Sequence, residues 1–312
     1  TFAQVGVVND AVDFSGNCGN MSSAIGPFAY DEGLVSGPRD GEAVVRIHNT
    51  NSKKIIVARF SVAAGHAVVT GDFAIPGLQG TGAKVALDFL DPTDTRGRGT
   101  LPTGQAADLM TLKDGREVRV TMIDAAIPSV FIAAAGIGGD TRTHPAKIDA
   151  NAMLMAQLEE IRRRASVAMG LAPDAEAAAL QIATPKVAMV GTASCYEDLA
   201  GTQHAPQTQD LQIRMISAGQ AHRAVPMTGT LALACAAVIK NSVVASCIAK
   251  GADPLNLRIG TPSGIVTVGA THNAGTGAVG AVRIFRTQRR LMDGHIYVSL
   301  PAAPVLPQPN QQ

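Results

Sequence analysis

The chain has little charge, few cysteines and no long apolar run. Among its 312 residues, 26 are Lys or Arg and 25 are Asp or Glu, so the formal net charge is +1. This balance gives no support to broad electrostatic binding of nucleic acid or of an anionic membrane. No uninterrupted stretch of about 18 apolar residues is present to span a bilayer. The sequence therefore predicts a globular protein that has neither a nucleic-acid partner nor a membrane partner.

The cysteines and histidines form no recognisable metal or disulfide pattern. The four cysteines, at positions 18, 195, 235 and 247, include no C-x-x-C pair and are too sparse for a disulfide framework or a zinc cage. The seven histidines lack H-x-H and H-E-x-x-H spacing. These absences predict free thiols in a reducing, cytoplasmic compartment and no metal site.

The two ends of the chain carry little information for folding. Thr1 opens the sequence without a Met and without the charged and apolar regions of a signal peptide, so we expect the natural protein to begin upstream. Residues 301–312, rich in Pro and Gln, are expected to form a disordered tail. At roughly 150 residues per domain, the length between these ends predicts two lobes.

Most of the chain reads as short β runs separated by Gly, Pro, Asn and Asp. Turns such as Ala64-Gly65 and Asp114-Gly115 are typical of hairpins, which favours antiparallel sheets. The predicted strands cover residues 43–48, 54–62, 66–73, 118–123, 129–134, 186–190, 211–215, 257–259, 265–268, 280–287 and 294–300.

Three segments have helical character instead. Residues 149–169 place apolar side chains at helical spacing and end at Gly170, which predicts an exposed amphipathic helix. Residues 19–30 and 228–239 are rich in Ala, Gly and other small apolar residues on nearly every face. A helix that is apolar all round is a buried helix, so both are expected at the centre of a lobe.

The two buried helices have similar polar entrances that contain glycine. We interpret them as the centres of two pseudo-symmetric lobes, each a curled, mostly antiparallel sheet around one helix, which makes the fold class α+β. Helix N-termini carry unsatisfied N–H groups and a partial positive charge. If both face a shared cleft, they form a site for a molecule with carboxylates at both ends.

Cys18 is the strongest catalytic candidate, because it lies between Asn17 and Gly19 at a helix entrance where a thiolate would be favoured. The alternative is a buried structural cysteine, which is the preferred interpretation for Cys235 and Cys247. His48 and Asn49 end a strand among side-chain donors suited to a carboxylate, although a surface turn explains the same residues equally well.

No cofactor is expected. Residues 275–280 match G-x-G-x-x-G, but the sequences on both sides are strand-like, whereas a dinucleotide site needs a helix after the glycines. A glycine-rich hairpin explains the motif better.

Several runs together resemble the PrpF family, which includes methylaconitate cis-trans isomerase, methylitaconate delta-isomerase and 4-oxalomesaconate tautomerase. The resemblance extends from Thr1 to about Val298. The runs are Thr1-Phe2-Ala3-Gln4-Val5, Gly16-Asn17-Cys18-Gly19-Asn20-Met21, Gly26-Pro27-Phe28-Ala29, Arg46-Ile47-His48-Asn49-Thr50-Asn51, Leu101-Pro102-Thr103-Gly104 and Arg289-Arg290-Leu291-Met292-Asp293-Gly294.

The resemblance implies a diaminopimelate-epimerase-like fold with the active site between two lobes, here residues 1–117 and 118–300. It also implies cofactor-free, cytoplasmic isomerisation of unsaturated di- and tricarboxylic acids by a 1,3-allylic proton shift, with propionate metabolism as one setting and a possible homodimer. The residues that it assigns are catalytic Cys18 and, for substrate binding, Asn17, Gly19, Asn20, Met227, Thr228, Gly229, Pro262 and Ser263.

The family's proton-transferring lysine has no counterpart in these 312 residues. The resemblance implies that it lies in a Thr-Ser-Lys segment before Thr1, together with strands of the first lobe. Two alternatives therefore remain beside the isomerase. One is an amino-acid racemase or epimerase, against which Thr228 stands where a two-thiol enzyme would have its second cysteine. The other is a non-catalytic carboxylate-binding protein.

Overall fold

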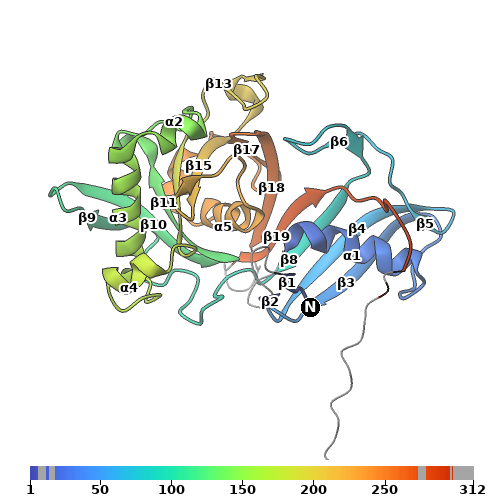
Figure 1. Cartoon of the computed structure of the whole chain (residues 1–312). Helices are drawn as coiled ribbons and strands as arrows, with labels where there is room; N and C mark the ends of the chain where they lie inside the picture. The colour runs from blue at the N-terminus through green and yellow to red at the C-terminus, as the bar shows by residue number, and fades with distance from the viewer. Residues whose placement is uncertain (6–11, 14–17, 273–278, 296, 298–312) are drawn as a thin grey trace, which may run out of the picture.

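A continuous sheet of 13 strands runs through the whole chain in the computed structural model, which describes residues 1–5, 12–13, 18–272, 279–295 and 297. Figure 1 shows a larger part on the left and a smaller part on the right, joined where β19 lies beside β8. The strand order is β3-β4-β8-β19-β18-β17-β15-β12-β11-β10-β9, with β5 on β4 and β16 on β15. The pairs β11–β12 and β15–β17 are parallel, and the other pairs in this sheet are antiparallel.

The predicted α+β class is confirmed. Each lobe was expected to have its own sheet, but strands from both parts of the molecule belong to the single 13-stranded sheet. The strands of the first part are β1 (Gln4–Val5), β2 (Val12–Asp13), β3 (Gly41–Asn49), β4 (Lys54–Ala63), β5 (His66–Ala67), β6 (Phe73–Ala74), β7 (Thr81–Gly82) and β8 (Val85–Leu90). Those of the second are β9 (Asp108–Thr111), β10 (Glu117–Ala125), β11 (Ile127–Ala133), β12 (Lys186–Thr192), β13 (Tyr196–Glu197), β14 (Gln203–His204), β15 (Leu211–Ser217), β16 (Gln220–Ala221), β17 (Leu257–Thr261), β18 (Gly264–His272) and β19 (Val279–Arg286).

In the described part of the chain the helices are fewer than the strands. They are α1 (Gly19–Asp31), α2 (Pro145–Asp149), α3 (Ala152–Ala168), α4 (Ala175–Leu180), α5 (Met227–Ala237) and α6 (Val243–Cys247), with 3-10 turns at Ala134–Ile137 and Pro206–Thr208. None of them is long and apolar enough to cross a membrane, within the residues that the structure describes.

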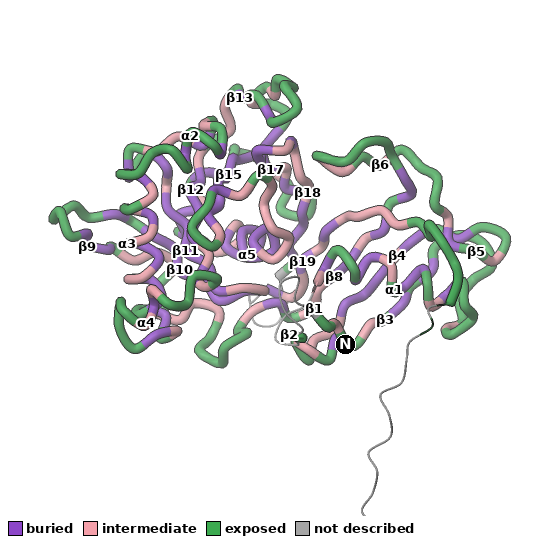
Figure 2. Tube along the Cα trace, in the orientation of Figure 1, coloured by how far each residue is buried: buried purple, intermediate pink, exposed green. Residues whose placement is uncertain are grey.

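Helix α5 is the buried centre of the second part, as the sequence predicts. Every residue from Gly229 to Ala236 is buried, and the helix packs against β10, β11, β18, β19 and α6. Figure 2 shows it in purple, surrounded by strands. Gly229 allows close contact with the sheet, because an ideal Cβ there would lie 2.5 Å from Sδ of Met215 in β15.

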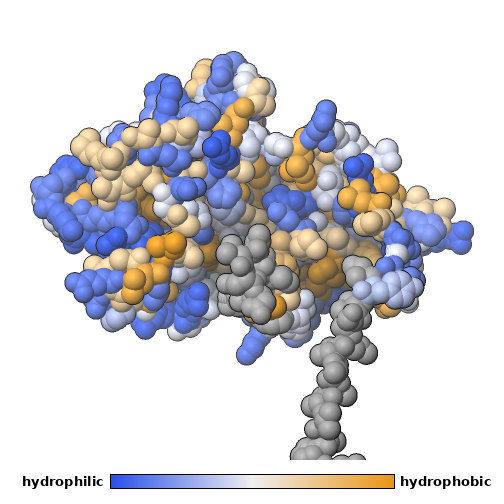
Figure 3. Space-filling view, in the orientation of Figure 1, coloured by the Kyte–Doolittle hydropathy of each residue, from blue (hydrophilic) through white to orange (hydrophobic). Residues whose placement is uncertain are grey.

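Helix α1 is buried on one face only, so the prediction of a fully buried helix is wrong here. Its inner face packs on β3, β4, β5 and β8, where an ideal Cβ on Gly26 would lie 2.8 Å from Cβ of Ala58. Its outer face exposes Met21, Ile25 and Phe28, the first with 59% of its surface accessible. Hydrophobic side chains are visible on the surface of this part of the molecule, on the right of Figure 3. Among the described residues, strands of the large sheet cover α1 on a single side.

The predicted helix 149–169 is observed as α3, three residues shorter at its start, and the short helix α2 ends at Asp149 just before it. Asn151 separates them, and its Oδ1 accepts a hydrogen bond of 3.1 Å from the N–H of Leu154, which makes it the N-cap of α3. Leu158, Ile161 and Ala165 are fully buried on the inner face of α3. The helix is thus amphipathic as predicted, but it is half-buried against the sheet rather than exposed.

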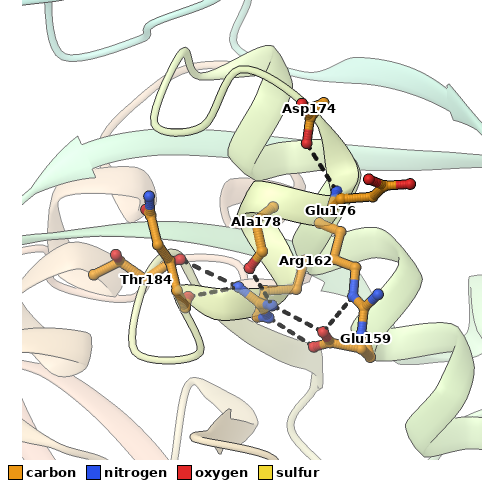
Figure 4. Close-up of polar contacts among 8 residues, drawn as sticks. Glu159, Arg162, Asp174, Glu176, Ala178 and Thr184 are labelled. Atoms are coloured by element: carbon orange, nitrogen blue, oxygen red, sulfur yellow. Dashed lines mark hydrogen bonds and ion pairs between the residues drawn. The ribbon is translucent and has the colours of Figure 1, made fainter.

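Arg162 of α3 holds the chain that follows α4 in place. The side chain is 5% exposed and donates to three carbonyl oxygens, those of Ala178, Gln181 and Thr184, at 2.9 to 3.2 Å. Its guanidinium also pairs with Glu159, at 2.6 Å from Nε to Oε2. Figure 4 shows the guanidinium between the Glu159 carboxylate on one side and the carbonyl groups on the other.

Several predicted strands differ from the observed ones. The run 66–73 is not one strand but forms β5 at His66–Ala67 and the first residue of β6 at Phe73, and β8 and β9 were not predicted. Of the run 294–300, the described residues 294, 295 and 297 are not in a strand. Residues 273–278 and 301–312, for which a hairpin turn and a disordered tail are predicted, lie outside the described residues. A strand and not a helix follows the glycine motif, as predicted.

The expected boundary between residues 117 and 118 falls inside the β9–β10 hairpin, since Glu117 pairs with Thr111. Strand β9, which precedes this boundary, therefore belongs to the second part of the sheet. The late strand β19 pairs with β8 of the first part. The division into lobes stays a prediction, and this pairing favours a boundary between β8 and β9.

Candidate functional site

The N-termini of α1 and α5 meet between the two parts of the sheet. An ideal Cβ at Gly19, the first residue of α1, would lie 1.2 Å from Cε and 2.6 Å from Sδ of Met227, the first residue of α5. Cζ of Phe89 in β8 lies 3.5 Å from the same point. Glycine at position 19 is what lets the two helix ends come this close.

The N-cap residues of the two helices, Cys18 and Pro226, make no side-chain capping hydrogen bond. The carbonyl of Cys18 accepts the N–H of Ser22 at 3.1 Å, and the carbonyl of Pro226 accepts the N–H of Thr230 at 2.9 Å. The N–H groups of the first three residues of each helix therefore have no partner within the helix. Two such helix ends in contact offer several donors and a favourable potential for carboxylates.

Cys18 lies where the sequence predicts it, at the N-cap of α1 with φ −102° and ψ 103°. Its thiol is free and half-buried, directly before Gly19 and hence beside the contact with Met227. A thiol in this place can take up and return a proton to a molecule held by the helix ends. Asn17, the residue before it, lies outside the described residues.

Residues on the two helix ends are brought together, including Gly19, Asn20, Met227, Thr228 and Gly229. Asn20 is exposed, and its Oδ1 accepts a hydrogen bond of 3.0 Å from Nε of Arg286 in β19. Thr228 is half-buried as the second residue of α5. The predicted binding role of these five residues remains a prediction, for which the geometry supplies a common location.

His48 and Asn49 lie at the end of β3, and their binding role stays a prediction. His48 is exposed on β3, where buried Ala43 and Val45 alternate with exposed residues, so it faces away from α1. Asn49 is buried, and its Oδ1 accepts hydrogen bonds from the N–H and the hydroxyl of Ser52, at 2.8 and 2.9 Å. These bonds shape the turn between β3 and β4, which agrees with the surface-turn alternative.

Pro262 and Ser263 lie at a different contact between the two parts. They form the turn between β17 and β18, and Cβ of Ser263 lies 3.6 Å from an ideal Cβ on Gly77 of the loop between β6 and β7. The carbonyl of Pro262 accepts the N–H of Leu199 at 2.8 Å. These two contacts are with loops, and the binding role of Pro262 and Ser263 stays a prediction.

A histidine–aspartate hydrogen bond that the sequence did not predict lies beside this turn. His204 Nε2 and Asp198 Oδ2 are 2.8 Å apart, and both side chains are largely buried. Burial favours the neutral acid, but hydrogen bonds from His204 and from backbone N–H groups outweigh it, so the pKa of Asp198 lies below its ordinary value. The pair has no sequence signal, because the two residues belong to no recognised motif.

The remaining thiols and metal-ligating groups add no second site. Cys235 and Cys247 are buried, as predicted, and burial raises the pKa of both thiols; Cys195 is exposed. Across the described part of the chain, no group of three or more His, Cys, Asp or Glu side chains is arranged to hold a metal ion.

Sequence and fold are similar to those of proteins named as isomerases. Residues 1–299 match the PrpF protein family. The chain is 35% identical to 3-methylitaconate isomerase of Eubacterium barkeri over 300 residues, which are 96% of this chain and 78% of that protein. It is also 35% identical to 2-methyl-aconitate isomerase of Cupriavidus necator, over 95% of this chain and 77% of that protein.

Among solved structures, methylitaconate delta-isomerase superimposes with a TM-score of 0.91 and 34% sequence identity, over 99% of this chain and 80% of that chain. The chain belongs to the PrpF family, and it is an isomerase with the diaminopimelate-epimerase-like fold.

Proposed function

We propose that the protein catalyses a 1,3-allylic proton shift in unsaturated di- or tricarboxylic acids such as methylitaconate, methylaconitate, aconitate or 4-oxalomesaconate. The observation that carries this proposal is the meeting of two helix N-termini at Gly19 and Met227, directly beside the free thiol of Cys18. Two relatives named for isomerisation of such acids, at 35% identity, support the same substrate class.

The reaction needs one group to remove a proton and another to return one. A base takes a proton from the γ-carbon, the electron pair forms a new double bond, and the former double bond accepts a proton at the α-carbon. Cys18 supplies one of these groups. The transient negative charge spreads toward a carboxylate, where each pre-oriented N–H donor stabilises it by about 3 kcal/mol. Rotation about the bond that is temporarily single permits cis-trans isomerisation at the same site.

The residues at the helix ends position the acid. The N–H groups of Gly19 and Asn20 on α1, and of Met227, Thr228 and Gly229 on α5, bind carboxylates from two directions. A hydroxyl is a poor proton shuttle near pH 7, so Thr228 argues against the amino-acid racemase. The second proton-transfer group is the family lysine, which has no counterpart in the 312 residues.

Proton NMR in deuterium oxide tests this proposal. The protein is offered trans-aconitate, methylitaconate and 4-oxalomesaconate, and the expected result is substrate-dependent deuterium incorporation that Cys18→Ser removes. Cys195→Ser is the matched control, because that thiol is exposed and distant in sequence from both helix starts. Tight binding of these acids without any exchange supports the carboxylate-binding alternative instead. Exchange at the α-carbon of an amino acid supports the racemase.

A cytoplasmic location and a homodimer belong to the same proposal. The four cysteines are free thiols in the structure, which suits a reducing compartment. Light scattering on the purified protein measures the oligomeric state, and a monomer at micromolar concentration contradicts the homodimer.

A further inference from the structure

Arg286 places a guanidinium beside the first turn of α1. It is the last residue of β19, the strand that joins the two parts of the sheet. Val282 and Ile284, four and two residues earlier on the same face, are buried in the core, and Arg286 pairs across the sheet with buried Val85. By this alternation the arginine faces α1 and not the solvent side of the sheet.

Only part of its hydrogen-bonding capacity is used. Nε donates to Oδ1 of Asn20 at 3.0 Å, and Nη1 donates to the carbonyl oxygen of Phe285 at 2.8 Å. A guanidinium has five N–H donors in a planar fork. Three of them therefore have no partner among the residues that the structure describes, and both bonded acceptors are uncharged.

Two neighbouring arginines, Arg283 and Arg290, are paired with acids. Arg283, on the opposite face of β19, donates from Nη2 to Oδ2 of Asp88 at 2.7 Å, and Arg290 pairs with Glu32. Arg286 has no carboxylate within salt-bridge distance in the described parts of the chain. Burial lowers its pKa, with no acidic group to offset the effect. A partly desolvated cation without a counter-ion is costly unless an anion arrives to pair with it.

We propose that Arg286 binds a substrate carboxylate additional to those held at the two helix ends, and so sets a preference for tricarboxylic over dicarboxylic acids. The inference rests on the proposed function, since it assigns a further contact to the same site. A carboxylate can accept two parallel hydrogen bonds from the unused N–H groups, while the bond to Asn20 keeps the guanidinium beside α1. No proton or electron is transferred in this step.

Calorimetric titration with saturated acids tests the contact without relying on turnover. Tricarballylate is the tricarboxylate probe and succinate the dicarboxylate probe, each titrated into the unsubstituted protein, Arg286→Gln and Arg286→Lys. Loss of a charge-assisted contact is expected to weaken tricarballylate binding by about 10- to 100-fold. Succinate binding should change by less than about threefold, the size of an effect without a direct contact.

The control is Arg289→Gln, which removes an exposed positive charge three residues further along the chain and is expected to change neither affinity. Should Arg286→Gln fail to fold, Arg286→Lys decides, because lysine keeps the charge but loses the planar fork and should weaken tricarballylate binding selectively. In turnover, KM for a tricarboxylate should rise while kcat stays nearly constant.

The outcomes separate this inference from the proposed function. Equal losses for both acids, or no loss for either, overturn the role of Arg286 even if the enzyme is active. Failure of the unsubstituted protein to bind tricarballylate also overturns it. Selective binding through Arg286 in a protein that exchanges no protons leaves the inference standing and removes the catalytic proposal.

Discussion

Met227 of α5 occupies the space that a side chain on residue 19 of α1 would need. The ideal Cβ position at Gly19 is 1.2 Å from Cε of Met227 and 2.6 Å from its Sδ. The two residues are 208 positions apart in sequence but form the contact at which both helices begin. The side chain at the start of each helix therefore limits the size of the side chain that fits at the start of the other.

Replacing Gly19 with Ala should displace the Met227 side chain. Alanine favours a helix over glycine by about 1 kcal/mol, so any loss of stability comes from the clash. We expect the free energy of unfolding in urea to fall by about 1–3 kcal/mol. Met227→Ala in the same chain should restore most of it, with a coupling energy of about 0.5–3 kcal/mol.

Gly136→Ala is the matched control for that cycle, because nothing lies within 4 Å of an ideal Cβ at that position. Additive effects of Gly19→Ala and Met227→Ala would contradict the contact.

The four thiols should differ sharply in alkylation of the folded protein. Cys18 and Cys195 are accessible to iodoacetamide, whereas Cys235 and Cys247 are buried, and burial raises the pKa of both buried thiols. Peptide mass spectrometry should find the buried pair modified only after denaturation. Tricarballylate should protect Cys18 and leave Cys195 reactive. Protection of both thiols, or of neither, is the result that counts against a carboxylate site beside Cys18.

Arg162 and Arg163 share Glu159 but should contribute very differently to stability. Arg162 is 5% exposed and also serves three carbonyl groups, whereas Arg163 is 41% exposed and donates to Glu159 at 2.6 Å. Arg162→Met leaves buried acceptors unpaired, and we expect a loss of about 2–3 kcal/mol in the free energy of unfolding. Arg163→Met should cost less than about 1 kcal/mol, as an exposed ion pair does. Equal losses in urea denaturation would show that the carbonyl contacts contribute nothing.

His222 should make the fold less stable in mild acid. It lies in the loop before α5, and burial together with the nearby charge of Lys186 lowers its pKa below the ordinary 6.5. Above pH 6.5 the imidazole is neutral in both the folded and the unfolded chain, so it does not affect the free energy of unfolding. Below it, the unfolded chain takes up the proton first, so stability falls with pH until the folded pKa is passed.

The measurement compares the free energy of unfolding at pH 7.5 and pH 5.5. His222→Gln should reduce the difference between the two values, whereas His66→Gln, which alters an exposed histidine on β5, should leave it unchanged. An undiminished difference in His222→Gln assigns the pH dependence to other groups.

Local sequence was enough to place the start of the candidate site. Small residues after Gly19 and after Met227 predict both central helices, and Cys18 is found at the N-cap where the polar, glycine-containing entrance puts it. The sequence also predicts α3 to within three residues at its start. Helix α2 was not predicted, because its five residues are too few to show apolar periodicity.

The position of Arg286 on the buried face of its strand could have been recognised from the sequence by strand alternation. Val282 and Ile284 mark the buried face of β19, and an arginine at the next position of that face is unusual enough to indicate a function. His48 shows the reverse case. Its sequence context suits a carboxylate, but alternation with buried Val45 puts it on the other face of β3.

The sequence by itself determined the elements whose causes are local: the α+β class, the two helices rich in small residues, and a free thiol at the start of the first. These follow from side-chain size, glycine positions and unsatisfied N–H groups within a few residues of each other. The tertiary structure decided which groups meet, including Gly19 with Met227, Arg286 with Asn20, and β19 with β8. Each of these contacts joins residues about 200 or more positions apart, and it forms only when the whole sheet has buried its apolar faces, which no local pattern specifies.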